Sequence, residues 1–290
     1  MVKKISITII AFAAVVLFWQ IFVPLGLNSQ EEIIFSIKKG EGSRDIALNL
    51  EKQGLIAWAS VFRLYVLTVG VSGNLQAGEY LISPSMNIPE IAQKFSKGEV
   101  IKVKLTIPEG FSAEQIKERL AGFPNIAEAE LALLDEKEGY LFPDTYYFSY
   151  NVTLEEALKA IEANFEKKIT PELKTEIGKQ GKTLEQIIIM ASLLEKEVKT
   201  KEEKELAAGV LWKRLKVGMA LQVDAEMWTY QNRVLPPRPI CNPGLESIIA
   251  SVYPRESGFW YYLSTAEGET IFSETLEDHN AAKYEYLKKR

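Results

Sequence analysis

Two acidic residues at the end of an apolar segment are the side chains in this sequence best placed to do chemistry. Glu195 and Glu197 follow the largely apolar run 187–194. A carboxyl group at the end of an apolar helix is poorly solvated, and desolvation raises its pKa. A carboxyl group that stays protonated near neutral pH can act as a general acid. The segment therefore predicts a proton donor, although a solvated helix end is the plainer interpretation.

Helical geometry narrows this choice only in part. Residues two positions apart on a helix point in nearly opposite directions, so at most one of the two glutamates faces a given cleft. Glu195 shares a line with Ile188 and Ala191, and Glu197 shares a line with Met190 and Leu193. Both lines are apolar, so periodicity does not choose between the two carboxylates.

Two further segments carry polar or aromatic side chains that could meet a substrate. Segment 138–147 (EGYLFPDTYY) groups aromatic rings around a Gly and a Pro. It is either a core loop in which Asp144 caps a turn, or a wall on which sugar rings stack. Segment 221–224 (LQVD) is either a polar turn or a substrate contact. Asp224 is the natural partner if the chain is a glycosidase with two carboxylates.

The remaining candidates are weaker. Asn242 begins a turn signal with Pro and Gly; Cys241 has no visible partner that would activate it; and His279 is expected at the surface of a polar C-terminal helix. A chain with one Cys and one His is not expected to hold a structural zinc, and we expect no metal or cofactor. The sequence lacks a phosphate loop, a dinucleotide fingerprint and a serine nucleophile elbow, which removes nucleotide-driven and acyl-transfer chemistry from the leading candidates.

The elements that must position these residues predict an α+β protein in two parts. A strand at 32–38, two helices and a strand at 77–82 form a β-α-α-β module within residues 30–100. The boundary is expected between 98 and 106, and a larger, mostly helical domain then covers 106–290. Its expected helices are 112–120, 127–134, 154–167, 171–177, 184–198 and 202–215, and a hairpin is expected at 260–264 and 269–272.

The N-terminus predicts a membrane anchor. Lys3 and Lys4 precede an apolar stretch over 5–25, which is long enough to cross a bilayer as a helix. The two lysines favour a cytoplasmic tail over 1–4, and Trp19 suits the opposite interface. A cleaved signal peptide is the alternative, but the apolar run is long and no small-residue cleavage site follows it. The net charge of −5 argues against a nucleic-acid partner.

Five motifs, taken in order, resemble one known family. They are EGYLFPDTYYF (138–148), MASLLEKE (190–197), KRLKVGMALQVD (213–224), LPPRPICNPG (235–244) and FSETLEDHN (272–280). With them the chain resembles, over nearly its whole length, the YceG-like family of endolytic murein transglycosylases.

The resemblance implies a function and a set of site residues. It implies that Glu195, the first glutamate of the EKE signature, is catalytic and that Glu197 is structural or supportive. The substrate contacts that it suggests are Tyr140, Asp144, Tyr146, Gln222, Asp224 and Asn242. It also implies that the β-α-α-β module is LysM-like.

The activity expected from the family is cleavage of MurNAc–GlcNAc β-1,4 bonds in nascent peptidoglycan strands. Cleavage would leave 1,6-anhydroMurNAc ends and terminate strand elongation. Peptidoglycan synthases are the expected protein partners, and the expected location is the cell membrane, with a single pass and the catalytic domain outside the cytoplasm.

The sequence departs from the family pattern in three places. The segment between Asp224 and Leu235 is short, Arg238 stands where a Gly is usual, and Thr270 stands where a His is common. These departures concern substrate contacts near the cleft and not the proton donor. Two alternatives to the family activity stay open. One is a non-catalytic cell-wall-binding protein, and the other is a hydrolytic muramidase that uses Glu195 and Asp224.

Overall fold

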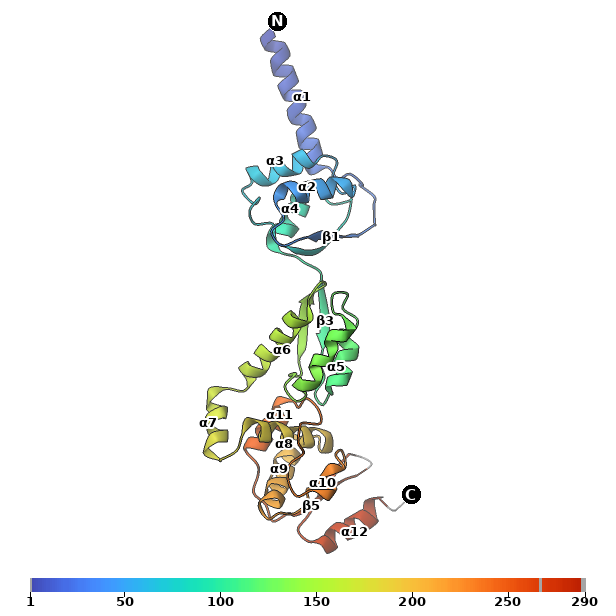
Figure 1. The fold of residues 1–290 in the computed structure, drawn as a ribbon. Coiled ribbons are helices and arrows are strands. Elements are labelled where there is room, and N and C mark those ends of the chain that lie inside the picture. Colours follow the sequence, from blue (N-terminus) through green and yellow to red (C-terminus); the bar gives the residue numbers. More distant parts are fainter. Residues whose placement is uncertain (1, 266–267, 288–290) are drawn as a thin grey trace. The chain divides into compact units, whose positions relative to one another are not determined.

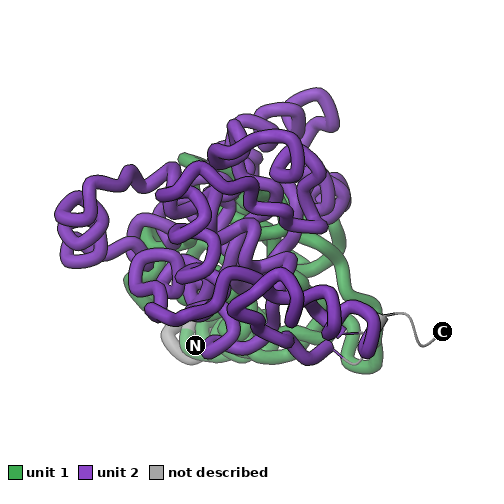
Figure 2. The backbone as a smooth tube through the Cα atoms, turned by 90° about the horizontal axis from the view of Figure 1, so that it is seen from below, with its two compact units in different colours: residues 1–103, 147–152 green, residues 104–146, 153–290 purple. Residues whose placement is uncertain are grey.

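The computed structural model describes residues 2–265 and 268–287, and the chain divides into two compact units (Figure 2). Unit 1 contains Met1–Val103 and Tyr147–Val152, and unit 2 contains Lys104–Tyr146 and Thr153–Arg290. The first transition lies within the boundary region that the sequence predicts. The return of 147–152 to unit 1 is not visible in the sequence pattern.

Unit 1 contains the predicted β-α-α-β order. A two-stranded antiparallel sheet pairs β1 with β2, with Ile33 opposite Ile82 and Ile37 opposite Gly78. Two helices connect these strands, and a third helix follows. The elements are α1 (Val2–Phe22), β1 (Ile33–Ile37), α2 (Ser43–Lys52), α3 (Ala59–Thr68), β2 (Gly78–Ile82) and α4 (Ile88–Lys97). A LysM-like character of this module stays a prediction.

Phe95 of α4 lies at the centre of the core of unit 1. Its ring centroid is 4.7 Å from that of Tyr80, 5.5 Å from that of Phe35 and 6.4 Å from that of Phe62. These rings come from both strands and two helices, and all four residues are fully buried. The aromatic cluster therefore joins every layer of the module.

Helix α1 is only partly described. Leu17 and Ile21 on its C-terminal half pack against the core of unit 1. In the part of the chain that the structure describes, no helix has the length and apolar character to cross a membrane. The predicted span 5–25 begins within residues 1–6, whose side chains lie outside the described part.

Unit 2 is mostly helical, as expected. A ribbon of β3 (Lys102–Thr106) and β4 (Thr145–Ser149) contains two of the transitions between the units. Strand β4 replaces part of the expected aromatic loop. The remaining elements of the first half of unit 2 are α5 (Ala113–Leu120), η1 (Glu128–Lys137), α6 (Leu154–Lys168) and α7 (Pro171–Lys179).

Segment η1 is a 3₁₀ helix where an α-helix was predicted. Its two buried residues, Leu131 and Leu134, are three positions apart. Side chains three positions apart stack directly in a 3₁₀ helix, which has three residues per turn. The apolar spacing therefore fits the tighter helix.

Helix α8 (Leu184–Glu197) forms the centre of unit 2 (Figure 1). Thr183 and Gln186 begin it with a capping box, and every residue over 187–194 is buried. It packs against α9 (Lys201–Lys216) and α11 (Leu245–Val252), which also pack against each other. Because α8 is apolar on all sides, other elements pack around it. This packing fixes the position of its last turn.

The C-terminal part differs most from the prediction. The sequence reads as turns after Gly218, but α10 (Trp228–Gln231) and α11 form there. The Pro243-Gly244 pair signals a turn, yet Gly244 is the N-cap of α11. The predicted hairpin is present as β5 (Tyr261–Ser264) and β6 (Thr270–Ser273), and α12 (Leu276–Leu287) follows. Residues 266–267 of its turn lie outside the described part.

Candidate active site

The last turn of α8 directs its two glutamates into different surroundings, as the helical geometry requires. The carboxylate of Glu195 faces α9 and the N-terminus of α11. The carboxylate of Glu197 faces the segment 222–225 and a small polar cavity. The two sites can therefore be compared as candidates for a proton donor.

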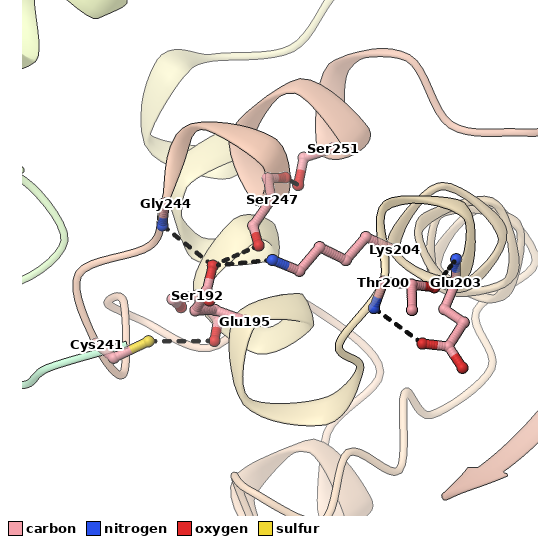
Figure 3. A network of polar contacts seen from close by, with 9 residues as sticks. All are labelled: Ser192, Glu195, Thr200, Glu203, Lys204, Cys241, Gly244, Ser247 and Ser251. Atoms are coloured by element: carbon pink, nitrogen blue, oxygen red, sulfur yellow. Dashed lines mark hydrogen bonds and ion pairs between the residues drawn. The ribbon is translucent and has the colours of Figure 1, made fainter. Parts of the chain in front are cut away.

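Glu195 is enclosed by donors (Figure 3). Its Oε2 accepts hydrogen bonds from the Gly244 N–H at 3.1 Å and from the Ser247 hydroxyl at 2.5 Å. The Lys204 ammonium lies 3.5 Å from the same oxygen. The side chains of Glu195 and Lys204 are 9% and 4% exposed.

These contacts connect Glu195 to two neighbouring helices. Gly244 and Ser247 lie in the first turn of α11, where unpaired N–H groups and the helix dipole attract an anion. Lys204 is almost completely buried, and a buried ammonium requires an opposite charge. Through its Oε2, Glu195 thus links α8, α9 and α11. The role of Glu195 as proton donor stays a prediction.

Glu197 lies on a polar cavity of about 140 Å³ that is built entirely from unit 2. Its Oε1 accepts a hydrogen bond from the Ala225 N–H at 3.0 Å. Burial raises the pKa of this carboxyl group, and the nearby negative charge of Asp224 raises it further. Protonation at higher pH than usual is the property that a general acid needs.

The cavity also contains buried polar atoms without partners. Within the described residues, the Tyr262 hydroxyl and His279 Nδ1 are buried and accept or donate no hydrogen bond, and both residues line the cavity. An unpaired buried polar atom costs about 1–3 kcal/mol, so such atoms are expected where a ligand completes the bonding. Burial raises the pKa of Tyr262, which therefore stays a neutral hydroxyl donor.

Two of the predicted substrate contacts, Gln222 and Asp224, line this cavity beside Glu197. Asp224 accepts a hydrogen bond from the Tyr230 hydroxyl. Gln222 has a φ of 56°, in the left-handed region that side chains other than glycine seldom adopt. Its N–H donates to the Thr229 carbonyl, which holds it there. Strained backbone of this kind is concentrated at functional sites.

The other predicted contacts lie elsewhere in unit 2. The Tyr140 ring packs against Phe165, with centroids 5.3 Å apart, as part of a hydrophobic cluster. The Tyr146 hydroxyl donates to the Phe142 carbonyl. Asp144 accepts hydrogen bonds from Asn164 and from the Thr145 N–H, and these bonds lower its pKa. Their contacts fit the core-loop interpretation of this segment better than a sugar-binding wall.

Asn242 is fully buried and its amide is used within the protein. Its Nδ2 donates to the Phe111 carbonyl and to the Glu138 carboxylate, and its Oδ1 accepts from the Leu141 N–H. It ties three distant loops together. A role in holding the fold accounts for these bonds, whereas a substrate contact does not.

Sequence reasoning missed several residues of the cavity. His279 was expected at the surface, but it is 7% exposed and its ring stacks on Tyr261 with centroids 5.2 Å apart. The Arg214 guanidinium is buried and donates to the carbonyls of Leu221 and Trp260. The sequence of α12 is polar, so it gives no sign that His279 is buried. No spacing in the sequence links His279 to α8.

The departures from the family pattern lie at identifiable places. Thr270 donates its backbone N–H to Glu203, and Arg238 lines a separate cavity together with Glu138.

Cys241 is buried, and burial raises its thiol pKa to about 12, which leaves it unreactive. In the described ranges 2–265 and 268–287, no group of three His, Cys, Asp or Glu side chains could hold a metal ion.

Comparisons with known proteins agree on one family. The model of the YceG-like family matches residues 35–228 and 227–285. A Bacillus subtilis protein named endolytic murein transglycosylase is 28% identical, over 91% of this chain and 87% of its own length. A Streptococcus pneumoniae protein of the same name is 26% identical, and the match spans 60% of that longer protein.

A solved structure supports the fold. The 2.6 Å crystal structure of a YceG-like protein from Listeria monocytogenes is 30% identical to this chain, with a TM-score of 0.56. The match covers 88% of this chain and all of the other.

Proposed function

Since the chain belongs to the YceG-like family, we propose that it is an endolytic lytic transglycosylase of peptidoglycan. Relatives from two genera are named for this activity, and one of them matches over most of its length. The bond cleaved is the β-1,4 linkage between MurNAc and GlcNAc. The product end is a 1,6-anhydroMurNAc, and cleavage in nascent strands would terminate their elongation.

Glu197 is the proton donor in this proposal. The observation that carries the assignment is the cavity of unit 2, on which a carboxyl group of raised pKa meets buried polar atoms without partners. Glu195 is instead the carboxylate that holds Lys204 and the N-terminus of α11. Glu195, the first glutamate of the EKE motif, is the residue predicted from the resemblance. The geometry supports Glu197, the second glutamate of the motif.

The mechanism requires a single carboxyl group. Neutral Glu197 donates its proton to the bridging oxygen as the bond from that oxygen to C1 of MurNAc breaks, through an oxocarbenium-like transition state. The Glu197 carboxylate then accepts the proton of the C6 hydroxyl of the same MurNAc. Oxygen O6 closes on C1, and no water is consumed. Gln222, Asp224 and Tyr262 are the groups able to hold the sugar in this cavity.

Anchoring and cellular role belong to the proposal as well. The apolar stretch 5–25 after Lys3 and Lys4 supports a single membrane pass with the catalytic unit outside the cytoplasm. An anchor would keep the enzyme in the layer where new glycan emerges. Peptidoglycan synthases are the protein partners that fit this position.

The test compares two matched variants on purified glycan strands. Glu197→Gln should lower kcat by about 10²–10⁴, the usual range for a general acid. Its thermal stability should be equal to or above that of the parent, because a raised carboxyl pKa lowers stability as pH rises through it. Mass analysis should detect anhydro ends from the parent and none from the variant.

Glu195→Gln is the control. It leaves the buried Lys204 without a counter-charge, which should cost about 3–5 kcal/mol of folding stability. Its kcat, measured at a temperature at which the variant is folded, should remain close to that of the parent. A Glu195→Gln variant that is stable but inactive, beside an active Glu197→Gln, would reverse the assignment.

The products separate the alternatives. Exclusively reducing ends would indicate a hydrolytic muramidase. An absence of any cleavage by the folded parent, together with binding to glycan, would indicate a non-catalytic wall protein.

A further inference from the structure

The segment around α3 has an unusual charge distribution. Arg63 is the only charged residue between Leu55 and Gly78, in a chain of which 25% is charged. The segment contains no Asp or Glu. The neighbouring helices α2 and α4 each carry both acidic and basic residues. This part of unit 1 is therefore less suited to face water than α2 or α4.

Helix α3 is apolar on its outer surface as well as on its inner one. Its inner residues, including Phe62 and Val66, are fully buried in the core of unit 1. On the outer side, Trp58, Leu64 and Leu67 are about half exposed, at 51%, 46% and 52%. Adjacent exposed apolar side chains of this size mark an interaction site more often than a solvated surface.

The outer surface of α3 is continuous with α1. Trp58 and Leu64 line an apolar groove of about 460 Å³ together with Phe12, Val16 and Leu17 of α1. Both helices belong to unit 1 and pack against each other. The exposed apolar side chains of α1 and α3 thus form one surface.

If α1 crosses the membrane, the length of α1 determines whether this surface contacts lipid or water. Residues 5–11 of the predicted span precede the groove, and at 1.5 Å per residue they cover about 10 Å. The hydrocarbon layer is about 30 Å thick. The span must therefore include the part of α1 that α3 flanks, which brings Trp58 and Leu64 to the depth of the lipid.

We propose that the outer surface of α3, formed by Trp58, Leu64 and Leu67, lies in the outer interface of the membrane beside α1. The inference rests on the proposed anchoring by α1 and adds a second membrane contact to it. Trp58 suits this interface, where amphipathic rings are enriched. Arg63 is exposed on the same helix, and its long side chain can reach anionic head groups.

A lipid surface fits these observations better than a protein partner. The groove opens onto α1, whose own exposed residues meet lipid in the proposed orientation. A protein docked there would need to share the groove with the acyl chains. Membrane contact at α3 would also limit the freedom of the module about the anchor.

The experiment places one fluorescent label at a time on the full-length protein in vesicles of phosphatidylethanolamine and phosphatidylglycerol. Cys241 is buried, with a thiol pKa of about 12, so an introduced cysteine can be labelled in its presence. The three sites are Ile10→Cys on α1, Leu67→Cys on α3 and Leu133→Cys on η1. Leu133 is the matched control, a leucine of unit 2 that is 56% exposed among charged neighbours.

Nitroxide-labelled lipids then report the depth of each label. We expect strong quenching of the Ile10 label by a nitroxide deep in the acyl chain. The Leu67 label should be quenched several-fold more than the Leu133 label, and most strongly by a nitroxide near the head group. Circular dichroism checks that each labelled variant is folded.

Each other outcome overturns the inference in a recognisable way. Quenching at Ile10 with none at Leu67 would leave the anchor in place and remove the contact of α3 with lipid. An absence of quenching at both sites would refute the anchoring and, with it, the contact of α3. Equal quenching at Leu67 and Leu133 would indicate non-specific adsorption of the protein.

Discussion

Glu195 and Glu197 are separated by one residue, but their carboxyl groups have different partners. The donors around Glu195 come from two other helices, and its oxygen is committed to them. Glu197 receives one backbone N–H at Oε1 and lies beside another carboxylate, Asp224, on a cavity. A single helix end thus supplies one carboxylate to the fold and one carboxyl group to the proposed chemistry.

The pH dependence of the activity follows from Asp224. Burial raises the pKa of Glu197, and the negative charge of Asp224 raises it further, so the acid form of Glu197 persists to higher pH. Asp224→Asn removes that charge and lowers the pKa of Glu197. Because the neutral acid is the active form, the fall of kcat/KM on the alkaline side should begin at lower pH than in the parent. A profile of kcat/KM against pH measures this shift.

Tyr230→Phe is the matched control for that measurement. It removes the hydroxyl that donates to Asp224 but keeps the Asp224 charge, so the alkaline side of the profile should not move to lower pH. An Asp224→Asn profile that coincides with the parent would refute the electrostatic coupling. A uniform loss at every pH, with reducing ends in the parent, would favour Asp224 as the base of a hydrolase.

The sequence points to the segment that holds the proposed acid, and the choice of Glu197 within it is a proposal that rests on tertiary contacts. Both glutamates lie on apolar lines of the helix, and family motifs alone favoured Glu195. The difference depends on Lys204, Ser247 and Asp224, which are brought to α8 by contacts distant in the sequence. His279 and Tyr262 join the cavity in the same way. Their roles depend on tertiary contacts, which periodicity does not reveal.

At the scale of the elements, the helices begin where short local patterns predict. Ser or Thr three residues before Glu or Gln forms a capping box at α5, α6, α8 and α9. These signals are local, and the predicted ranges agree closely with the helices observed. Two of the missed elements, β4 and α11, are short and lie beside Pro and Gly, where turn signals dominate. Their formation depends on packing against β3 and α8.

Close backbone contact at α9 gives a test of that packing. A Cβ at Gly209 would lie 2.2 Å from the Arg255 carbonyl oxygen, which is backbone and cannot turn away. Gly209→Ala should therefore destabilise the protein by about 1–3 kcal/mol, although alanine favours helices. Urea unfolding measures the change in free energy.

Gly178→Ala on α7 is the counterpart. A Cβ at Gly178 would meet nothing within 4 Å among the described residues. This substitution should stabilise by about 0.5–1 kcal/mol, since it only removes backbone freedom from the unfolded chain. If both substitutions stabilise the protein, helix propensity and not the contact with Arg255 determines the effect of Gly209→Ala on the free energy of unfolding.

At the scale of the whole molecule, each unit has a core of its own. The aromatic cluster around Phe95 belongs entirely to unit 1, and the clusters around α8 belong entirely to unit 2. Phe95→Ala should cost unit 1 about 3–5 kcal/mol, because it leaves a cavity among three rings. Hydrogen exchange should show faster opening of α2–α4, with α8 unchanged.

Phe165→Ala is the reciprocal variant in unit 2, where the ring packs beside Tyr140 and Phe142. It should accelerate exchange at α8 and leave unit 1 unchanged. Faster exchange in both units from either variant would show that they unfold as one cooperative body.

The path of the chain between the units has an evolutionary consequence. The chain leaves unit 1 after Val103, returns at Tyr147–Val152 and leaves again. A fragment that ends at Val103 would lack Tyr147–Val152 and would divide β3, so it would not contain the whole of unit 1. Transfer of unit 1 alone would therefore require the chain to be joined at three points instead of one.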